Sequence, residues 1–522
     1  YMESITSTAL SSASAFSSRA TAIPQECPVL PPAFQPRPDL AERLMPRILA
    51  DGPHVGLAGA TVAFGMGGTG KSTLVGSLVR HPAVSGAYQR LCWLPLGQTP
   101  DLRRLLALTL HQLTKGESSA NKSDEQLGDI LALQQKVVTA TKGLSVLCVL
   151  DDVWDPAHAR ALGEPLEGAV IVVTTRLHHL LPGAHHVHCG LLSQDESLQL
   201  LLRAGDVDLP PNGQAPQAAK EVVELCGRLP LTLALAGAML QEHADDWERK
   251  LVPLLRGDNR SELRRRSLND DDDDDDEEEE ETTEGRVITS SLSLLRSKKH
   301  HMSVVLFMMC AAFPEDATVA AAVFDALEEP FSKMVRADAK KRSKKDKDGD
   351  EKKKEEGSFK KTIRPRKCLK VLLEHSLLQG SIRDGIQMHD LLRVYVLARL
   401  SPSELEDLHC GILKALQADL TANSDSPSRS NEVQAYARAH FEHHAAGACT
   451  MTPPRKGGPT LAEDHPVLLF ATDEQSADWV SLAMARGAGL VRLSAAAGAA
   501  AAAGQWLRSG RLWLASLGLG GE

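Results

Sequence analysis

A glycine-rich stretch followed by a lysine and a serine constrains the fold of this chain more than any other feature of its sequence. The stretch reads Gly65-Met-Gly-Gly-Thr-Gly-Lys71-Ser72-Thr73 and fits the pattern G-x-x-x-x-G-K-[ST]. It follows an apolar, strand-like run at Thr61–Phe64 and precedes a helical run at Leu74–Val79. A strand, a glycine-rich loop and a helix in this order predict a loop whose backbone N–H groups surround phosphate oxygens.

Each part of this loop has a predicted role in holding a nucleotide and Mg²⁺. The glycines let the backbone approach the phosphates, where a larger side chain would obstruct it. Lys71 is expected to reach the β- and γ-phosphates, and the Ser72 hydroxyl to coordinate Mg²⁺. The predicted nucleotide-binding residues of the loop are Gly65, Gly67, Gly68, Thr69, Gly70, Lys71, Ser72 and Thr73.

A loop of this kind also needs a carboxylate on a neighbouring strand to hold the metal ion. The apolar run Val146–Leu150 leads directly into Asp151 and Asp152. We predict that Asp151 holds Mg²⁺ through water, and that Asp152 orients or deprotonates an attacking water. A further apolar run, Val170–Thr175, leads into Arg176, which is placed to sense a γ-phosphate, although a purely structural arginine fits the same position.

Apolar runs alternate with helical stretches from about residue 31 to residue 190. This alternation predicts an α/β domain with a parallel sheet covered by helices on both faces. The expected strands are Thr61–Phe64, Leu91–Leu96, Ser145–Leu150 and Ala169–Thr174, and the expected helices include Leu102–Leu113 and Asp124–Thr141. Helical periodicity continues in several segments beyond residue 190.

Composition excludes several classes of protein. The formal net charge of the 522 residues is −10, but removing the twelve consecutive acids at 270–281 leaves +2, so the charge belongs to one segment. The acidic balance argues against bulk affinity for nucleic acid. No apolar run approaches the roughly 18 residues that span a membrane. Nine singly scattered cysteines argue against a disulfide scaffold and favour the cytoplasm, with the nucleus left open by the basic run Lys340–Lys347.

Together these motifs resemble the NB-ARC family of STAND-class P-loop ATPases, which includes plant immune receptors and the apoptosome scaffold. The resemblance covers roughly Phe34 to Gly447. The matching motifs, in order, are the phosphate loop Gly65–Thr73, the LDDVW motif Leu150–Trp154, the TTR sensor Val173–Arg176, the GLPL-like Cys226–Leu231, the CxxFPED-like Cys310–Asp316 and the MHD triplet Met388–Asp390.

The resemblance implies further residue roles. It implies that Phe34 and Arg37 belong to the segment near the adenine, that Pro230 contacts the adenine, and that His389 lies against the β-phosphate of ADP. It also implies an ADP-bound resting state, exchange to ATP, opening of a winged helix, and self-oligomerisation with protein partners in defence or cell-death-like signalling. Hydrolysis would be at most a slow reset. Arg228 departs from the pattern, because glycine is usual there and a positive φ would strain an arginine.

We expect seven segments along the chain. They are a disordered Ser-rich tail at 1–30, a P-loop nucleotide-binding domain at 31–190, a helical ARC-type domain at 191–257, an acidic disordered linker at 258–285, a winged-helix domain at 286–400 with a basic disordered insertion at 333–361, a helical domain at 401–450, and a linker with a single tetratricopeptide-like hairpin at 451–522. The two charged segments are interpreted as solvated insertions rather than as binding sites.

Other interpretations stay open beside this one. The run His185–Cys189 permits a zinc site, but adjacent residues of a strand point to opposite faces. His440, His443 and His444 have a helical spacing that suits a metal or a packed face, and the resemblance supports packing. A turnover ATPase or phosphotransferase would need an arginine finger, and a STAND-type transcription regulator would need an additional helix-turn-helix domain.

Overall fold

A computed structural model describes residues 21–49, 59–98, 100–114, 130–207, 217–241, 247–256, 282–297, 300–315, 317–345, 364–421 and 427–448. The chain divides into two compact units. The first unit holds Tyr1–Ala204, Asp208–Ala215 and Gly227–Ala234, and the second holds Gly205–Val207, Pro216–Cys226 and Leu235–Glu522.

The core of the first unit is a five-stranded parallel sheet, which confirms the predicted fold class for this part of the chain. The strands are β1 (Thr61–Phe64), β2 (Arg90–Pro95), β3 (Val146–Val153), β4 (Val170–Thr175) and β5 (His185–His188). Their order across the sheet is β2-β3-β4-β1-β5, so β1 lies between β4 and β5. Because all pairs are parallel, the carboxyl ends of the strands meet at one edge.

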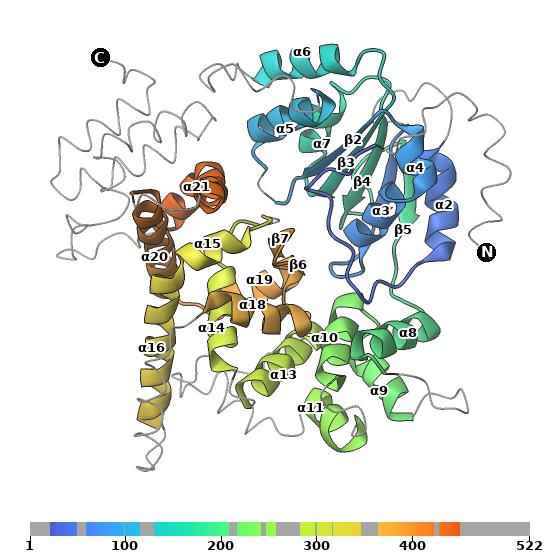
Figure 1. Cartoon of the computed structure of the whole chain (residues 1–522). Coiled ribbons are helices and arrows are strands. Elements are labelled where there is room, and N and C mark those ends of the chain that lie inside the picture. The colour runs from blue at the N-terminus through green and yellow to red at the C-terminus, as the bar shows by residue number, and fades with distance from the viewer. Residues whose placement is uncertain are drawn as a thin grey trace, which may run out of the picture. The chain divides into compact units, whose positions relative to one another are not determined.

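Helices cover both faces of this sheet (Figure 1). Successive strand residues point to opposite faces and nearly all are apolar, so each face needs its own cover. In β3, Leu147 and Val149 pack with the first group of helices, whereas Cys148 and Leu150 pack with the second. The first group is α2 (Pro38–Ile48), α3 (Lys71–Val79) and α4 (Pro82–Ala87), and the second is α5 (Leu102–Thr114), α6 (Ile130–Thr141) and α7 (Pro156–Gly163).

A further helix, α8 (Gln194–Gly205), follows the sheet and begins at a capping box. The backbone N–H of Ser193 donates to the Glu196 carboxylate at 2.7 Å, and the backbone N–H of Glu196 donates to the Ser193 hydroxyl at 3.2 Å. These reciprocal bonds satisfy N–H groups that a helix start would otherwise leave without partners. The next helices are α9 (Gln217–Leu225) and α10 (Pro230–Leu240), and α10 begins in the first unit and ends in the second.

The second unit is mostly helical. Its further elements are η3 (Trp247–Leu251), α11 (Val252–Arg256), α13 (Thr283–Ser297), α14 (His301–Cys310), α15 (Ala321–Ala326), α16 (Glu328–Lys345), α18 (Pro365–Glu374), β6 (Gln379–Ser381), β7 (Gly385–Gln387), α19 (Asp390–Leu397), α20 (Pro402–Thr421) and α21 (Pro427–Gly447). The sequence of α14 is apolar on nearly all sides, and this helix is buried against α13, α16 and α18.

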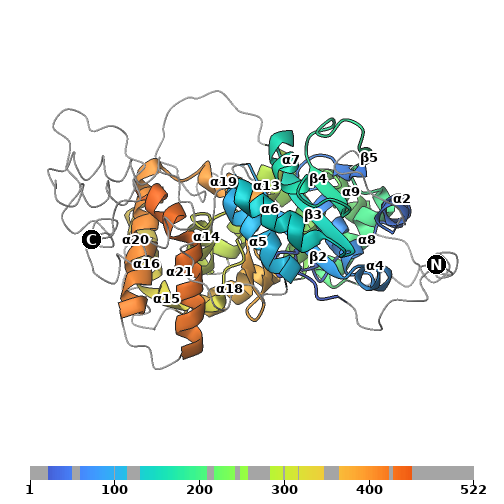
Figure 2. The ribbon, with the colours of Figure 1, turned by 90° about the horizontal axis from the view of Figure 1, so that it is seen from above.

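Two smaller arrangements complete this unit. Strands β6 and β7 form an antiparallel ribbon, and Val319 pairs with Ile386 of that ribbon, which ties it to the segment before α15. Helices α20 and α21 pack along each other (Figure 2).

Part of the segments predicted as disordered proves to be ordered. Residues 333–345 of the predicted basic insertion form the later part of α16, since Lys, Arg and Ala favour helix and the buried side chains of Phe331 and Val335 anchor it. Residues 283–285 of the predicted linker begin α13. In the predicted tail, Cys27 is buried in the same hydrophobic cluster as α3.

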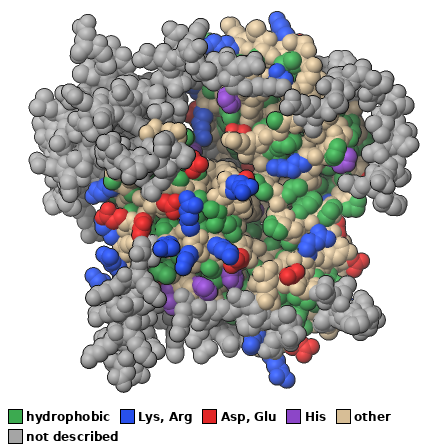
Figure 3. Space-filling view, in the orientation of Figure 1, with side chains coloured by type: hydrophobic (Ala, Val, Ile, Leu, Met, Phe, Trp, Pro, Cys, Tyr) green, Lys and Arg blue, Asp and Glu red, His purple; other side chains and the backbone are tan. Residues whose placement is uncertain are grey.

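The remaining predictions of this kind fall outside the described residues: the acidic run 270–281, residues 346–361 of the basic insertion, and the hairpin predicted within 451–522. Within the described ranges, every helix is too short or too polar to cross a membrane. On the face shown in Figure 3, Lys and Arg side chains are interspersed with acidic and hydrophobic ones.

Candidate functional site

The glycine-rich loop connects β1 to α3 and has a backbone that larger residues would not adopt. Gly68 and Gly70 have φ angles of +75° and +83°, in the left-handed region that favours glycine. A Cβ atom on Gly65 would collide with the carbonyl oxygen of Cys189. Gly70 is also the residue from which α3 starts, so the positive end of this helix faces the loop. The loop therefore has the form of a phosphate cradle.

Lys71 lies at the start of α3 and is buried, with its side chain turned back toward the loop. Its ammonium Nζ donates to the carbonyl oxygens of Gly65 at 2.9 Å and Met66 at 2.7 Å. Burial and then the positive charge of Arg176 lower the pKa of Lys71 below its usual value. The arrangement places one cation, held by backbone oxygens, at the loop.

Ser72 and Asp151 meet at the carboxyl edge of the sheet, as their predicted shared role requires. The Ser72 hydroxyl donates to Asp151 Oδ1 at 2.7 Å. The Thr174 hydroxyl also donates to Asp151 Oδ1, and it accepts the backbone N–H of Asp152 at 2.8 Å. Hydroxyl and carboxylate oxygens are the ligands that Mg²⁺ prefers, so the residues present fit this ion.

Asp152 points into a group of its own with Trp154 and Arg176. Its φ angle is +51°, and the pairing of β3 with β4 shifts register between Leu150 and Val153. The Trp154 indole N–H donates to Asp152 Oδ2 at 2.8 Å, and Arg176 Nε lies 3.5 Å from Asp152 Oδ1. The Arg176 guanidinium carbon lies 4.9 Å from the centre of the Trp154 ring, within the range of a cation–π contact.

The other residues of the predicted loop have the following surroundings. The Thr69 hydroxyl donates to the carbonyl oxygen of Met66 at 3.0 Å, which closes the loop on itself. Gly67 in the loop and Thr73 in the first turn of α3 are half-buried. The ring of Pro230, the first residue of α10, lies 3.7 Å from the position of a Cβ on Gly70. The structure therefore brings the GLPL-like proline to the loop.

The segment before α2 contacts the chain after β5 rather than the loop. Arg37 donates through Nη1 to the carbonyl oxygen of Gly190 at 2.9 Å, and its Nε lies 3.7 Å from Glu196 Oε1. Phe34 lies in the same segment, and its carbonyl oxygen accepts from Arg203 Nη1 of α8 at 2.5 Å. Arg228 has a φ angle of +54°, in the left-handed region. The backbone strain expected for an arginine at this position of the motif is therefore present.

His389 belongs to the second unit. It is the residue that caps the start of α19, where its Nδ1 accepts the backbone N–H of Leu391 at 3.2 Å. Since Nδ1 accepts a hydrogen bond, the proton of a neutral His389 resides on Nε2.

Two residues without a predicted role complete the site. Thr174 joins Asp151 to the backbone of Asp152, and Trp154 joins Asp152 to Arg176. A sequence signal for Thr174 was available, because this residue lies near the end of an apolar, strand-like run. A threonine there is buried, and with an exposed fraction of 0% its hydroxyl needs a partner.

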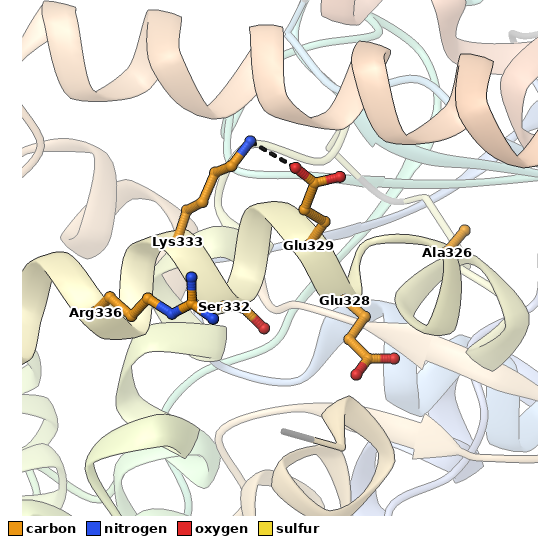
Figure 4. Close-up of a pocket in the computed structure, with 6 residues that line it drawn as sticks. All are labelled: Ala326, Glu328, Glu329, Ser332, Lys333 and Arg336. Carbon is orange, nitrogen blue, oxygen red and sulfur yellow. Dashed lines mark ion pairs between the residues drawn. The ribbon is translucent and has the colours of Figure 1, made fainter. Parts of the chain in front are cut away.

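Two other places on the chain do not add to this site. The histidines of β5 belong to no group of metal-ligating atoms among the described residues, and His186 and His188 pack against the ring of Phe64. A shallow hollow around the start of α16 is lined by Ala326, Glu328, Glu329, Ser332, Lys333 and Arg336 (Figure 4). In it Lys333 pairs with Glu329 of the preceding turn at 2.7 Å.

A glycine-rich loop with positive φ angles, a buried lysine and a serine beside a strand-end aspartate define a P-loop nucleotide-binding domain. Residues 42–206 match the family model of the NB-ARC domain. The chain therefore carries an NB-ARC domain, the nucleotide-binding domain of STAND-class P-loop ATPases.

Comparisons with individual proteins agree with this assignment. The regulatory protein AfsR of Streptomyces griseus is 31% identical over 223 residues, which cover 42% of this chain and 22% of that protein. The disease resistance protein ADR1 of Arabidopsis thaliana is 28% identical over 201 residues, 38% of this chain and 22% of that protein. The crystal structure of a STAND protein with a tetratricopeptide repeat sensor from Pyrococcus horikoshii shares the fold, with a TM-score of 0.50 and 12% identity over 94% of this chain and 59% of that one.

The chain spans only about a fifth to a quarter of the length of the curated relatives that it matches first, at 19%, 24% and 23%.

Proposed function

We propose that this chain contains a nucleotide-operated switch that holds ADP at rest, exchanges it for ATP, and then opens and self-assembles in signalling. The observation that carries the nucleotide part is the 2.7 Å contact between Ser72 and Asp151 next to the buried Lys71. These groups would hold a nucleoside diphosphate or triphosphate with Mg²⁺. When bound, the ion neutralises phosphate charge.

The surroundings of Asp152 support a switch rather than a turnover enzyme. Both of its carboxylate oxygens already have partners, Trp154 on one and Arg176 on the other. A carboxylate engaged in this way is poorly placed to take a proton from water, because it would first have to give up these partners. Arg176 would sense the γ-phosphate by exchanging Asp152 for it, and hydrolysis would then be a slow reset.

The remaining roles rest on the resemblance. Phe34, Arg37 and Pro230 would define the adenine side, and His389 would meet the β-phosphate of ADP. We take α14, α15 and α18 with the β6–β7 ribbon to be the winged helix that opens during exchange. Moving such an equilibrium from 1:99 to 99:1 requires about 5.5 kcal/mol of differential binding, which the γ-phosphate and new subunit contacts would share. The eight described cysteines are free thiols, in keeping with a reducing compartment such as the cytoplasm.

The nucleotide content of freshly purified protein tests this proposal. We expect chromatography of the denatured protein to release close to one ADP per chain, and ATP turnover to be slow. Protein that carries no nucleotide and hydrolyses ATP at several turnovers per second would favour the turnover enzyme and overturn the switch.

Replacing His389 by valine should release ADP or promote oligomerisation, and unchanged ADP retention in a monomer would contradict its assigned role.

A further inference from the structure

A cluster of histidines lies between α20 and α21, entirely within the second unit. His409 comes from α20, and His443 and His444 come from α21. One ring nitrogen of each lies within 4.8 Å of one ring nitrogen of both others. The exposed fractions of His409 and His444 are only 4% and 0%, and His443 is half-buried. Three imidazole nitrogens this close together have the spacing of a set of metal ligands.

A hydrogen bond to a carbonyl group fixes which nitrogen of His443 carries a proton. His443 Nε2 lies 3.0 Å from the carbonyl oxygen of Ala312, which can only accept, so this nitrogen is protonated and Nδ1 holds the lone pair. His444 Nε2 lies 2.7 Å from the Tyr436 hydroxyl, and its Nδ1 lies 3.0 Å from His409 Nδ1. The Nδ1 atoms of His409 and His444 therefore share one proton in a hydrogen bond, and a metal ion bound between them would take the place of that proton.

This geometry matches a bound divalent ion of the zinc type. Zinc–nitrogen bonds of about 2.0–2.1 Å in a tetrahedron put two ligand nitrogens about 3.3 Å apart, close to the 3.0 Å between His409 and His444. Histidines that bind zinc commonly donate their other N–H to a carbonyl or another acceptor, as His443 does to Ala312.

We propose that His409, His443 and His444 bind one Zn²⁺ ion, which joins α20 to α21. An all-imidazole ligand set suits zinc, whereas Mg²⁺ and Ca²⁺ prefer oxygen ligands, so this site is chemically distinct from the one at Ser72 and Asp151. The fourth position would hold water. The packing of Gly447 against the ring of His409 supports a fixed orientation of that ring, because a Cβ at position 447 would collide with it.

The test is a calorimetric titration of the full, untagged chain with ZnCl₂ after removal of metals with EDTA. An excess of Mg²⁺ is kept present so that the oxygen ligands of the phosphate loop do not contribute. We expect one zinc per chain, and Co²⁺ in its place should give the visible absorption of a tetrahedral site. Replacing the half-buried His443 by glutamine should weaken zinc binding by at least about tenfold.

The matched control is His440→Gln, since His440 packs on Tyr436 in the same cluster but is not one of the three ligands. It should retain one zinc per chain. A second variant, Gly447→Ala, keeps all three ligands and displaces His409, so it should also weaken binding. A chain that binds no zinc, or one in which His443→Gln and His440→Gln bind it equally well, would overturn the proposal and leave the histidines as a packed, hydrogen-bonded cluster.

Discussion

At the scale of single residues, Gly65 is a position with no room for a side chain. The carbonyl oxygen of Cys189 occupies the space of its missing Cβ, and this oxygen belongs to backbone that follows β5. A side chain at residue 65 would push the loop away from the sheet.

We therefore expect Gly65→Ala to lower the free energy of unfolding by about 1–3 kcal/mol, as overpacking of a tight site does. Gly86→Ala is the matched control, because Gly86 lies in α4 and a Cβ added there would meet no atom within 4 Å. It should stabilise the chain by roughly 0.5–1 kcal/mol, since alanine is the better helix former. Urea denaturation of both variants measures the difference, and equal effects would contradict the steric argument.

Arg228 is the opposite case to Gly65. Its backbone conformation favours glycine, but the residue present carries a long side chain. Its φ angle of +54° costs an arginine about 1 kcal/mol relative to a glycine. We expect Arg228→Gly to raise the free energy of unfolding by roughly 0.5–1 kcal/mol, while Arg228→Ala, which keeps the strain, should bring no such gain. Thermal unfolding of the pair separates the two, and a gain in both variants would show that the side chain, not the backbone, matters.

At the scale of elements, the ends of β3 and β4 act together. Thr174 in β4 bonds both to the carboxylate of Asp151 and to the backbone of Asp152 at the end of β3. The strand pair thus orients the carboxylate through a hydroxyl group, and Thr174→Val removes that group with little change in shape.

We expect Thr174→Val to cost about 1–3 kcal/mol of stability, because two buried polar groups lose a partner. It should weaken ADP binding more in the presence of Mg²⁺ than in its absence, since Asp151 is the carboxylate that we propose faces the metal ion. Thr141→Val is the control: its buried hydroxyl bonds only to the carbonyl oxygen of Val137 within α6. Fluorescence titration with labelled ADP gives the comparison, and an identical loss with and without Mg²⁺ would speak against the role of Thr174.

The sequence predicts the meeting of Ser72 and Asp151 because parallel strands bring their carboxyl ends to one edge, so order along the chain is enough. It does not predict the partners of Asp152, which depend on a positive φ and on a register shift that no residue pattern signals. Nor does it predict that Arg37 holds Gly190, a contact across about 150 positions of the chain. The prediction of disorder at 333–345 is wrong for another reason: a charged composition indicates disorder, but helix propensity and two buried anchors prevail there.

At the scale of the whole molecule, nucleotide binding should raise the free energy of unfolding. A ligand that binds only the folded chain at 100 times its dissociation constant adds about 2.7 kcal/mol. We expect ADP with Mg²⁺ to raise the melting temperature of the chain, and Lys71→Met to abolish most of that rise, because the loop loses its cation. Lys142→Met replaces an exposed lysine at the opposite edge of the sheet and should leave the ADP-dependent rise intact. Differential scanning fluorimetry measures both, and a full rise in Lys71→Met would contradict the assignment of the loop.

The parallel sheet has a consequence for how the chain can be observed. Its carboxyl edge carries all the chemistry described above for the nucleotide. At the amino edge, Glu167 precedes β4, is exposed and takes no part in that chemistry. Seven of the eight described cysteines are buried, and burial raises the pKa of their thiols, that of Cys92 to about 12, so they react slowly with alkylating dyes. In a chain with Cys410 and Cys449 replaced by serine, a cysteine introduced at position 167 would therefore accept a fluorophore selectively, on the same sheet as the loop but at its far edge.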